Sequence, residues 1–419
     1  MRSRTELAPV VLILGSGCSA IPVCDMHSCP LARWTQREPS SVAEALPPPR
    51  HSARDLRHGV VDCFEEGLRR TEPGKTDRLA YCEGSAVVFD GAHLVLASDK
   101  PIPGEGRTSV FELPLRSNGQ AGRSPRRYLR ADGYAAARKF EDATVTPEHE
   151  RVFLTTGFDR VKPSGDTWDG YNVLLTYPMG RPEAAQVVSA HDEDKATSVG
   201  LREVFRPHLR TPAFPEGAPY FKVEGVAALP DQELLFGVRE LGASYQDFEY
   251  TVMILSARWR QAPSGRIVLD PTTVRVAYRK DRLDVAGLQV GLSSLERHPQ
   301  TGELFLLVSY EQEDPVANPD LAHGALGGFL LTLDAESFAA GRAPRPVVGA
   351  GGEPVRFVNK PEGLTFLTAH QLLLLFDDDR VLECGVPGHR HIRAPHQTAV
   401  AVLELGQYPG AVATGPAVK

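Results

Sequence analysis

A chain of 419 residues can form one large repeat fold or two to three ordinary domains, so its length leaves the architecture open. Hydrophobic residues make up 42% and charged residues 24% of this globular composition, while 38 glycines and 34 prolines favour many turns over long helices. The net charge of −7 argues against the concentrated basic surface that nucleic-acid-binding proteins need, so no nucleic-acid partner is expected.

Residues 1–18 have the pattern of an export signal. Arg2 and Arg4 precede an apolar run from Ala8 to Leu14, and small residues follow before Cys18. This segment resembles a bacterial lipoprotein signal, and the resemblance implies that a lipid is attached to Cys18. The expected localisation is therefore the bacterial periplasm or cell surface, with the lipid anchor as the chain's contact with a membrane.

Four further cysteines fall into two closely spaced pairs. An exported protein folds under oxidising conditions, so Cys24 with Cys29 and Cys63 with Cys82 are plausible disulfides, which leaves Cys384 single. The first pair could instead hold a soft metal together with the histidine between its two cysteines, but that set supplies three ligands rather than four.

The chain divides into a tether, a folded body and a tail. Residues 19–57 are rich in Pro, Ser and Arg and lack periodic apolar residues, which is typical of a flexible tether. Residues 58–407 carry the apolar segments of a folded body. Residues 408–419 are mostly small and include Gly and Pro, so a disordered tail is expected there.

One unit recurs five times in the folded body: an acidic or small polar residue, an apolar strand, a polar turn and a second apolar strand. The copies start 58, 83, 69 and 69 residues apart. This exceeds the roughly 40–50 residues of a common propeller blade but accommodates four strands with long loops. The sequence therefore predicts an all-β fold, a single β-propeller of five blades, with six blades as the alternative if a degenerate blade lies in the insertions. The five copies are Glu83 to Asp99, Glu141 to Asp159, Glu224 to Glu240, Ser293 to Glu311 and Glu362 to Asp378.

Further β segments follow each unit, as four-stranded blades require. The fifth unit lacks a fourth strand, so an N-terminal strand around His58 to Phe64 is expected to pair with the last blade and close the ring. A short helical insertion at Val199 to Leu209 accounts for the longest spacing. Third strands are expected at Ser109 to Leu115, Tyr171 to Tyr177, Phe248 to Trp259, Gly327 to Leu333 and Thr398 to Leu405.

Charged residues stand at both ends of the repeated unit. Three copies begin with Lys-x-Glu and a fourth keeps the acid. Residues two apart on a strand point to the same side, and the first strand of a propeller blade lines the central channel, so these side chains should form a ring at one mouth. The second strand runs back, so its charged end returns to the same face. The predicted ligand-binding residues are Lys139, Glu141, Lys222, Glu224, Lys360, Glu362, Glu83 and Arg239, and the predicted metal ligands are Asp99, Asp142, Asp159, Asp377 and Asp378.

The predicted ring has two interpretations that can coexist. As a structural feature, its ion pairs would brace neighbouring blades, with the lysines relieving repulsion between the carboxylates. As a functional feature, its carboxylates would take an oxygen-liking cation such as Ca²⁺, and its lysine and arginine side chains would take an anionic group such as phosphate or carboxylate.

Four of the repeated segments, from Leu79 to Leu405, resemble bacterial phytase-like or esterase-like propeller domains and a related propeller family of unknown function. The quoted segments are CEGSAVVFDGAHLVLASDK, KFEDATVTPEHERVFLTTGFDR, KVEGVAALPDQELLFGVRE and NKPEGLTFLTAHQLLLLFDDD. The resemblance implies a propeller and, for a true β-propeller phytase, clustered carboxylates that hold Ca²⁺ over a phosphate site.

Two functions follow from these features. The first is a surface-anchored, monomeric propeller that binds a small anionic ligand or a protein partner at its charged channel face. The alternative is a Ca²⁺-dependent hydrolase of phosphoesters or esters, in which a metal-activated water attacks the substrate. An α/β-hydrolase esterase is not expected, because the chain has no Gly-x-Ser-x-Gly nucleophile elbow.

Overall fold

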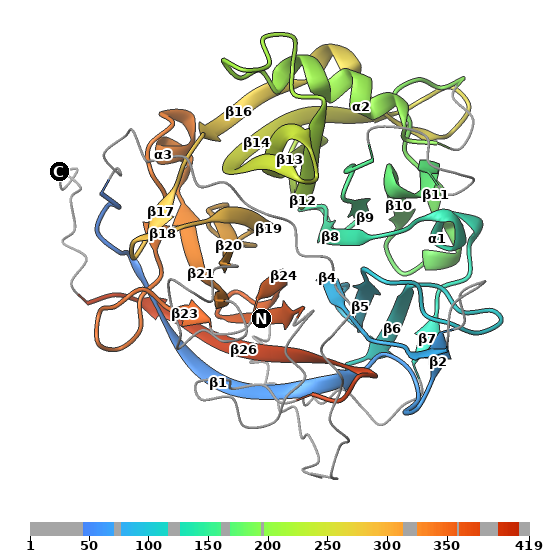
Figure 1. Cartoon of the computed structure of the whole chain (residues 1–419), viewed down its shortest axis with the longest axis horizontal. Helices are drawn as coiled ribbons and strands as arrows, with labels where there is room; N and C mark the ends of the chain where they lie inside the picture. The colour runs from blue at the N-terminus through green and yellow to red at the C-terminus, as the bar shows by residue number, and fades with distance from the viewer. Residues whose placement is uncertain are drawn as a thin grey trace, which may run out of the picture.

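The protein is a five-bladed β-propeller, with its blades arranged around a central channel (Figure 1). The computed structural model describes residues 45–70, 77–115, 126–160, 168–193, 197–312, 325–357, 360–377 and 393–409. The prediction of an all-β propeller with five blades is confirmed. The predictions for the signal, Cys18, Cys24, Cys29, Asp378 and Cys384 fall outside the described residues.

Each blade is an antiparallel sheet whose first strand lies nearest the channel (Figure 1). The first blade contains β4 (Gly84–Phe89), β5 (His93–Ser98), β6 (Val110–Pro114) and β7 (Arg127–Tyr128), and the second contains β8 (Phe140–Val145), β9 (Arg151–Thr156), β10 (Leu174–Pro178) and β11 (Gln186–Val187). The third contains β12 (Tyr220–Leu229), β13 (Glu233–Ser244) and β14 (Asp247–Gln261), with β15 (Ile267–Leu269) and β16 (Arg275–Lys280) both paired to β14. The fourth contains β19 (Gly291–Arg297), β20 (Leu304–Gln312) and β21 (Ala325–Leu333), with β22 (Arg345–Pro346) and β23 (Arg356–Phe357) both paired to β21.

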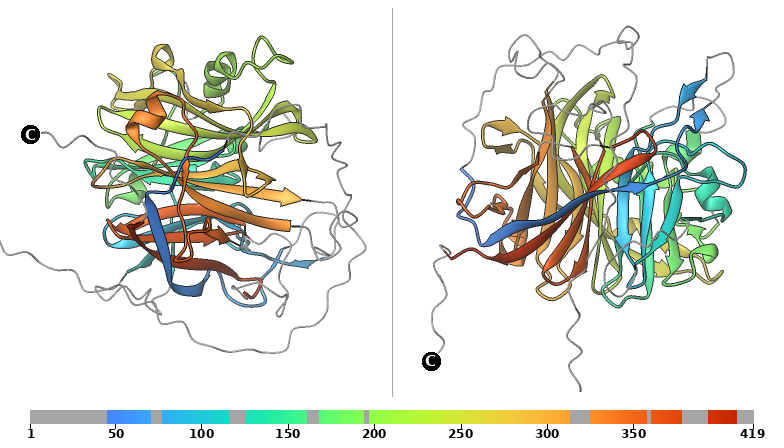
Figure 2. Two further views of the ribbon diagram at one scale, coloured as in Figure 1. Left: turned by 90° about the vertical axis from the view of Figure 1, so that its left-hand side faces the viewer. Right: turned by 90° about the horizontal axis from the view of Figure 1, so that it is seen from below.

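The fifth blade joins the two ends of the described chain. It contains β24 (Pro361–Thr368), β25 (Gln371–Phe376), β26 (Gln397–Gln407) and, as its outer strand, β1 (His51–Asp62). The β1–β26 pairing runs from His51 opposite Gln407 to Asp62 opposite Gln397, and in Figure 2 the two strands lie side by side. The expected closure of the ring is therefore present, and its strand starts at His51 rather than near His58. Residues 51–57, expected to belong to the tether, pair through the backbone, which a search for apolar periodicity does not detect.

The remaining elements are short. Two small hairpins are formed by β2 (Arg69–Arg70) with β3 (Arg78–Leu79) and by β17 (Asp284–Val285) with β18 (Leu288–Gln289). The expected helical insertion is α2 (Gly200–Phe205) followed by η3 (Arg206–His208), and its Leu201 and Phe205 are buried in the core between the second and third blades. The other helices are α1 (Asp132–Ala136), η1 (Trp168–Tyr171), η2 (Pro182–Ala184), η4 (Pro271–Thr273) and α3 (Ala335–Ala339). Within the described part of the chain, no helix has the length and apolar character needed to cross a membrane.

Strands inside the blades are buried on both faces, which explains their unbroken apolar runs. In β25, Leu372 and Leu374 pack in the core shared with the fourth blade, while Leu373 and Leu375 pack in the core shared with the first. Alternate side chains of a strand point to opposite faces, so each run of leucines contributes to two cores. The five blades are held together by these shared apolar layers.

A disulfide between Cys63 and Cys82 links the closing strand to the first blade, as the sequence suggested. Cys63 follows β1 directly, and Cys82 lies two residues before β4. Both cysteines are buried among the apolar side chains of that core. The strand that closes the ring is therefore fixed covalently at one end and by the β26 ladder along its length.

Candidate functional site

The first strands of the blades all begin at one end of the channel, and there they bring the charged motifs together. Lys139 and Lys360 immediately precede β8 and β24, while Lys222 lies on β12. Asp159, Arg239, Glu240 and Glu311 arrive at the same end from the second strands. Ten charged side chains at this end form one connected set of ion pairs, called here the channel network: Lys139, Glu141, Asp159, Lys222, Glu224, Arg239, Glu240, Glu311, Lys360 and Glu362.

Two lysines connect the second and third blades. Lys222 forms an ion pair with Glu224 on its own strand, and its Nζ lies 3.3 Å from Oε1 of Glu141 on β8. The Nζ of Lys139 lies 3.6 Å from the same oxygen and 2.8 Å from Oδ2 of Asp159. Glu141 is thus held between two ammonium groups from neighbouring blades.

Arg239 connects the third blade to the fourth from a fully buried position. Its guanidinium Nη1 lies 3.0 Å from Oε2 of Glu224 and donates to the hydroxyls of Ser293 at 2.6 Å and Ser309 at 2.5 Å. Its Cζ lies 4.8 Å from the centre of the Tyr250 ring. This contact is a cation–π interaction. The guanidinium is therefore enclosed by hydrogen-bond acceptors and an aromatic face.

Lys360 completes the connection to the fifth blade. Its Nζ lies 2.7 Å from Oε1 of Glu311 on β20 and 2.6 Å from Oε1 of Glu362 on β24. Glu311 also lies 3.5 Å from Nη2 of Arg239. Four successive blades are consequently linked by one chain of alternating charges.

Carboxylates outnumber cations in the channel network, and burial shifts their ionisation. Burial raises the pKa of Glu141 to about 8 and that of Glu362 to about 7. Burial also acts on Glu224, but Arg239 and then Lys222 hold the pKa of its carboxyl below the usual value. Burial penalises an ionised carboxyl unless a cation compensates for the lost hydration. The network therefore holds an ionised acid at Glu224 and acids that readily take up a proton at Glu141 and Glu362.

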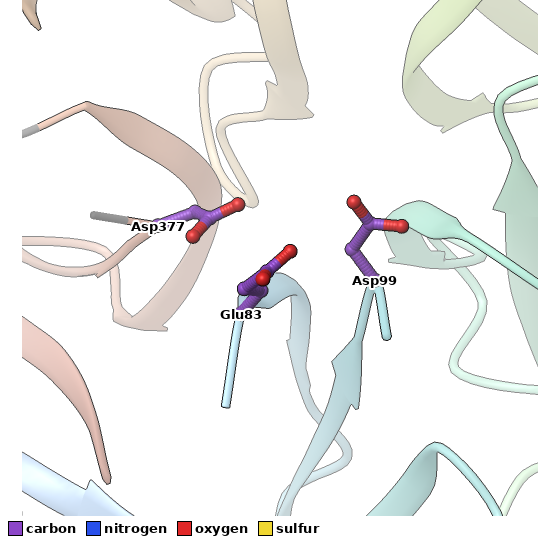
Figure 3. A group of neighbouring side chains, drawn as sticks. All are labelled: Glu83, Asp99 and Asp377. Carbon is purple, nitrogen blue, oxygen red and sulfur yellow. The ribbon is translucent and has the colours of Figure 1, made fainter. Parts of the chain in front are cut away.

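Three more carboxyl groups converge beside this network at the channel mouth (Figure 3). Glu83 precedes β4, Asp99 follows β5 and Asp377 follows β25, and each offers an oxygen within 4.8 Å of the others. The Nζ of Lys100 lies 2.5 Å from Glu83 and 3.0 Å from Asp99. These three residues, called here the mouth acids, could supply oxygen ligands to a cation once the ammonium group of Lys100 moves aside.

Lys139 and Arg160 form a positive flank near the mouth acids, close enough for Asp99 to act electrostatically on Lys139. Arg160 is 34% exposed, its Nη1 lies 3.3 Å from Oδ2 of Asp159, and its guanidinium covers the Tyr171 ring at 4.4 Å from the centroid. Lys139 shares the Asp159 carboxylate and is partly exposed. Guanidinium and ammonium groups in this position can bind phosphate or carboxylate.

Two predicted metal ligands do not lie with the mouth acids. Asp142 is fully buried: its Oδ2 accepts hydrogen bonds from the backbone N–H of Val226 at 2.8 Å and of Leu295 at 3.2 Å, and its Oδ1 accepts from the Ser294 hydroxyl at 3.0 Å. It thereby joins three blades, because it lies on β8 of the second blade while its donors lie on β12 of the third and β19 of the fourth. Asp159 binds Lys139 and Arg160 instead of joining a group of acids. Among the described residues, three acids converge in two places, at the mouth acids and at Glu141 with Glu224 and Glu362, and neither Asp142 nor Asp159 belongs to either set.

The site also uses residues that the sequence analysis did not select. Ser293 opens the fourth repeat at the position where other repeats have a glutamate, and its hydroxyl lies 2.6 Å from that of Ser309. Both serines accept hydrogen bonds from Arg239, as does the carboxylate of Glu224. The sequence signal for this contact was the serine at the start of the fourth repeat, because a side chain shorter than glutamate leaves room there for a long side chain from the neighbouring blade.

No family model and no curated protein sequence matches the chain. Among solved structures, a DUF4623 family protein from Bacteroides eggerthii aligns with a TM-score of 0.37 and 10% sequence identity, over 86% of this chain and 78% of its own. A member of the DUF4221 family from Bacteroides vulgatus aligns with a TM-score of 0.36 and 6% identity, over 86% of this chain and 100% of its own. A structure described for the GH130 family of mannoside phosphorylases aligns with a TM-score of 0.41 and 11% identity over 86% and 96%. Scores and identities this low carry no inference about activity.

Proposed function

We propose that the protein is a ligand-binding propeller that takes a divalent cation and an anionic group at the channel mouth. The observation that carries this proposal is the convergence of the mouth acids, Glu83, Asp99 and Asp377, within 4.8 Å of one another. Carboxylate oxygens are the ligands that Ca²⁺ prefers, and Ca²⁺ tolerates the irregular geometry that three loop-borne acids provide. Waters and the anionic ligand would fill its remaining positions.

Lys100 acts as an internal competitor for the cation. Its ammonium group neutralises Glu83 and Asp99, yet 43% of the side chain is exposed, so it can turn into solvent at little cost. The cation then replaces one positive charge by two in a place where carboxylates are in excess. The anion would lie against Arg160 and Lys139, on the flank next to the cation.

The proposed setting is outside the cytoplasm. The Cys63–Cys82 disulfide supports folding in an oxidising compartment. An anchor at Cys18 would hold the propeller at the membrane surface through the tether, and the protein would act as a monomer toward a small anionic ligand.

The test is calorimetric titration of the purified protein with CaCl₂ and, separately, MgCl₂. The wild type should bind one Ca²⁺, Asp99→Asn should weaken binding, and Lys100→Met should strengthen it by removing the competing charge. Glu233→Gln, which removes a carboxylate from the exposed pair with Arg275, is the matched control and should bind as the wild type does. Absence of saturable binding in both the wild type and Lys100→Met would refute the proposal.

Hydrolysis of a phosphoester is the second candidate, and one observation favours it. Glu141 adjoins the mouth acids closely enough for Asp99 to act on its ionisation, and burial raises the pKa of Glu141 to about 8. A carboxyl group that keeps its proton near neutral pH can protonate a leaving group while a metal-bound water attacks.

This candidate is tested with a panel of phosphate and carboxylate esters in the presence of Ca²⁺. Activity should be lost in Glu141→Gln while Ca²⁺ binding persists. A wild type that binds Ca²⁺ but hydrolyses none of the esters would leave the protein as a binding module.

A further inference from the structure

The opposite end of the channel contains a cavity of about 290 Å³. The channel network lies where the first strands begin, and this cavity lies where the same strands end. Its walls come from all five blades. Its lining includes Phe89 at the end of β4, Val145 at the end of β8, Ala228 near the end of β12, Glu296 on β19 and Phe366 on β24.

The cavity is suited to a small organic molecule. Phe89, Val145 and Phe366 give it apolar walls, and Pro147 and Leu367 extend them. Binding pockets for small ligands are mostly apolar with a few polar groups that fix orientation, and this volume lies near the lower end of their range. The occupant is therefore small and has an apolar body.

Glu296 is the buried acid in this cavity. It is 8% exposed and accepts a hydrogen bond from the backbone N–H of Arg297 at 3.0 Å. Among the described residues it has no ion-pair partner: the side chain of Arg297 acts on it electrostatically but does not come within ion-pair distance. The acids of the channel network, in contrast, each have a cation beside them.

Arg297 also lines the cavity but compensates the charge of Glu296 only in part, because its guanidinium lies beside Gly302 in the turn after β19. Burial raises the pKa of its carboxyl to about 8, and Asp142, deeper in the channel, adds a further acid to this stretch. A buried carboxylate is stabilised when an opposite charge and hydrogen-bond donors come close to it. A ligand that brings a cationic N–H group would supply both.

We propose that this cavity binds a small organic ammonium ion, with its N–H groups on the Glu296 carboxylate and its apolar body against Phe89, Val145 and Phe366. A metal ion is a poorer occupant, because Ca²⁺ and Mg²⁺ need about six or more oxygen ligands and the cavity supplies one carboxylate. This site lies on the face opposite the mouth acids and does not depend on them.

The experiment measures binding of benzylammonium to the whole protein by calorimetry, with benzyl alcohol and benzoate as uncharged and anionic probes of similar shape. Benzylammonium should bind saturably and benzoate should not. Glu296→Gln keeps the shape of the side chain and should weaken benzylammonium binding by at least about tenfold, because a charge-assisted hydrogen bond is lost. Benzyl alcohol binding should be unchanged in that variant.

Two further variants keep the result interpretable. Val145→Phe narrows the cavity without altering its charge and should weaken benzylammonium and benzyl alcohol alike. Glu233→Gln removes a carboxylate from the surface and should bind as the wild type does. Ca²⁺ titration of Glu296→Gln should match the wild type, which separates this site from the one proposed at the mouth. The proposal is overturned if benzylammonium does not bind saturably, or if Glu296→Gln binds it as tightly as the wild type.

Discussion

Replacing Arg239 by Met should destabilise the propeller strongly, because this side chain is the buried link between the third and fourth blades. Met preserves most of the apolar volume but removes the partner of Glu224 and the donor to Ser293 and Ser309. Arg239 is 1% exposed, so solvent cannot replace it. Removing one member of a buried ion pair costs about 3–5 kcal/mol, since the other charge stays buried without compensation.

The control is Arg275→Met, the same substitution in an exposed pair. Arg275 lies 2.7 Å from Glu233, and its side chain is 60% exposed. An exposed pair contributes about 1 kcal/mol or less, so this variant should be nearly as stable as the wild type. Urea unfolding followed by circular dichroism measures both free energies of unfolding.

The pH dependence adds a second readout for Arg239. Because Arg239 and Lys222 hold the pKa of Glu224 below its ordinary value of 4.5, ionised Glu224 contributes stability above that pH and loses it as pH falls toward the lowered pKa. The stability difference between the wild type and Arg239→Met should therefore narrow below pH 4.5. Equal losses in Arg239→Met and Arg275→Met at neutral pH would refute the role of Arg239 as a buried link.

Three further predictions concern the same framework. Asp142→Ala should lower the free energy of unfolding in urea by about 3 kcal/mol or more, because it leaves two backbone N–H groups and a hydroxyl without their acceptor. Asp142→Asn should lower it clearly less, and similar losses in the two variants would contradict the bridging role. Burial raises the pKa of Glu141 from 4.5 to about 8 and that of Glu362 from 4.5 to about 7, so the folded protein binds more protons than the unfolded chain in this range. The free energy of unfolding should therefore fall as pH rises from 4.5 to about 8. The double variant Glu141→Gln with Glu362→Gln should flatten that slope, and an unchanged slope would rule out these acids as its source. Replacing Cys63 and Cys82 by Ala should lower the free energy of unfolding by about 3 kcal/mol, as loop closure over a separation of 19 residues implies. A reducing agent should have no further effect on this double variant. A double variant as stable as the wild type would contradict the prediction.

Much of the fold could be predicted from the sequence because each blade repeats a local pattern. Runs such as Leu372 to Leu375 fit a strand that is buried on both faces, and charged residues before and after the paired strands predict which ends share a mouth. The channel network follows from strand direction alone, so Lys222, Glu224 and Arg239 could be assigned to it from their positions in the repeat.

Other features depend on distances between blades, which a local pattern does not encode. Glu141 and Asp142 are adjacent and both acidic, yet Glu141 faces the lysines while Asp142 accepts hydrogen bonds from two other blades. The cavity beside Glu296 is assembled from the ends of five strands that lie far apart in the sequence. No stretch of the chain contains enough of that cavity to indicate its presence.

The pairing of β1 with β26 also constrains how the chain can fold during synthesis. A contact such as Arg54 with Glu404 joins residues separated by 350 positions, so β1 leaves the ribosome long before its partner strand exists. Until then the strand is an unsatisfied hydrogen-bonding edge, which can pair with another chain. Folding of the fifth blade is consequently a late event, and a chain interrupted before Gln397 lacks the strand that receives β1. Incomplete or slowly translated chains should be the form of this protein that most needs a chaperone.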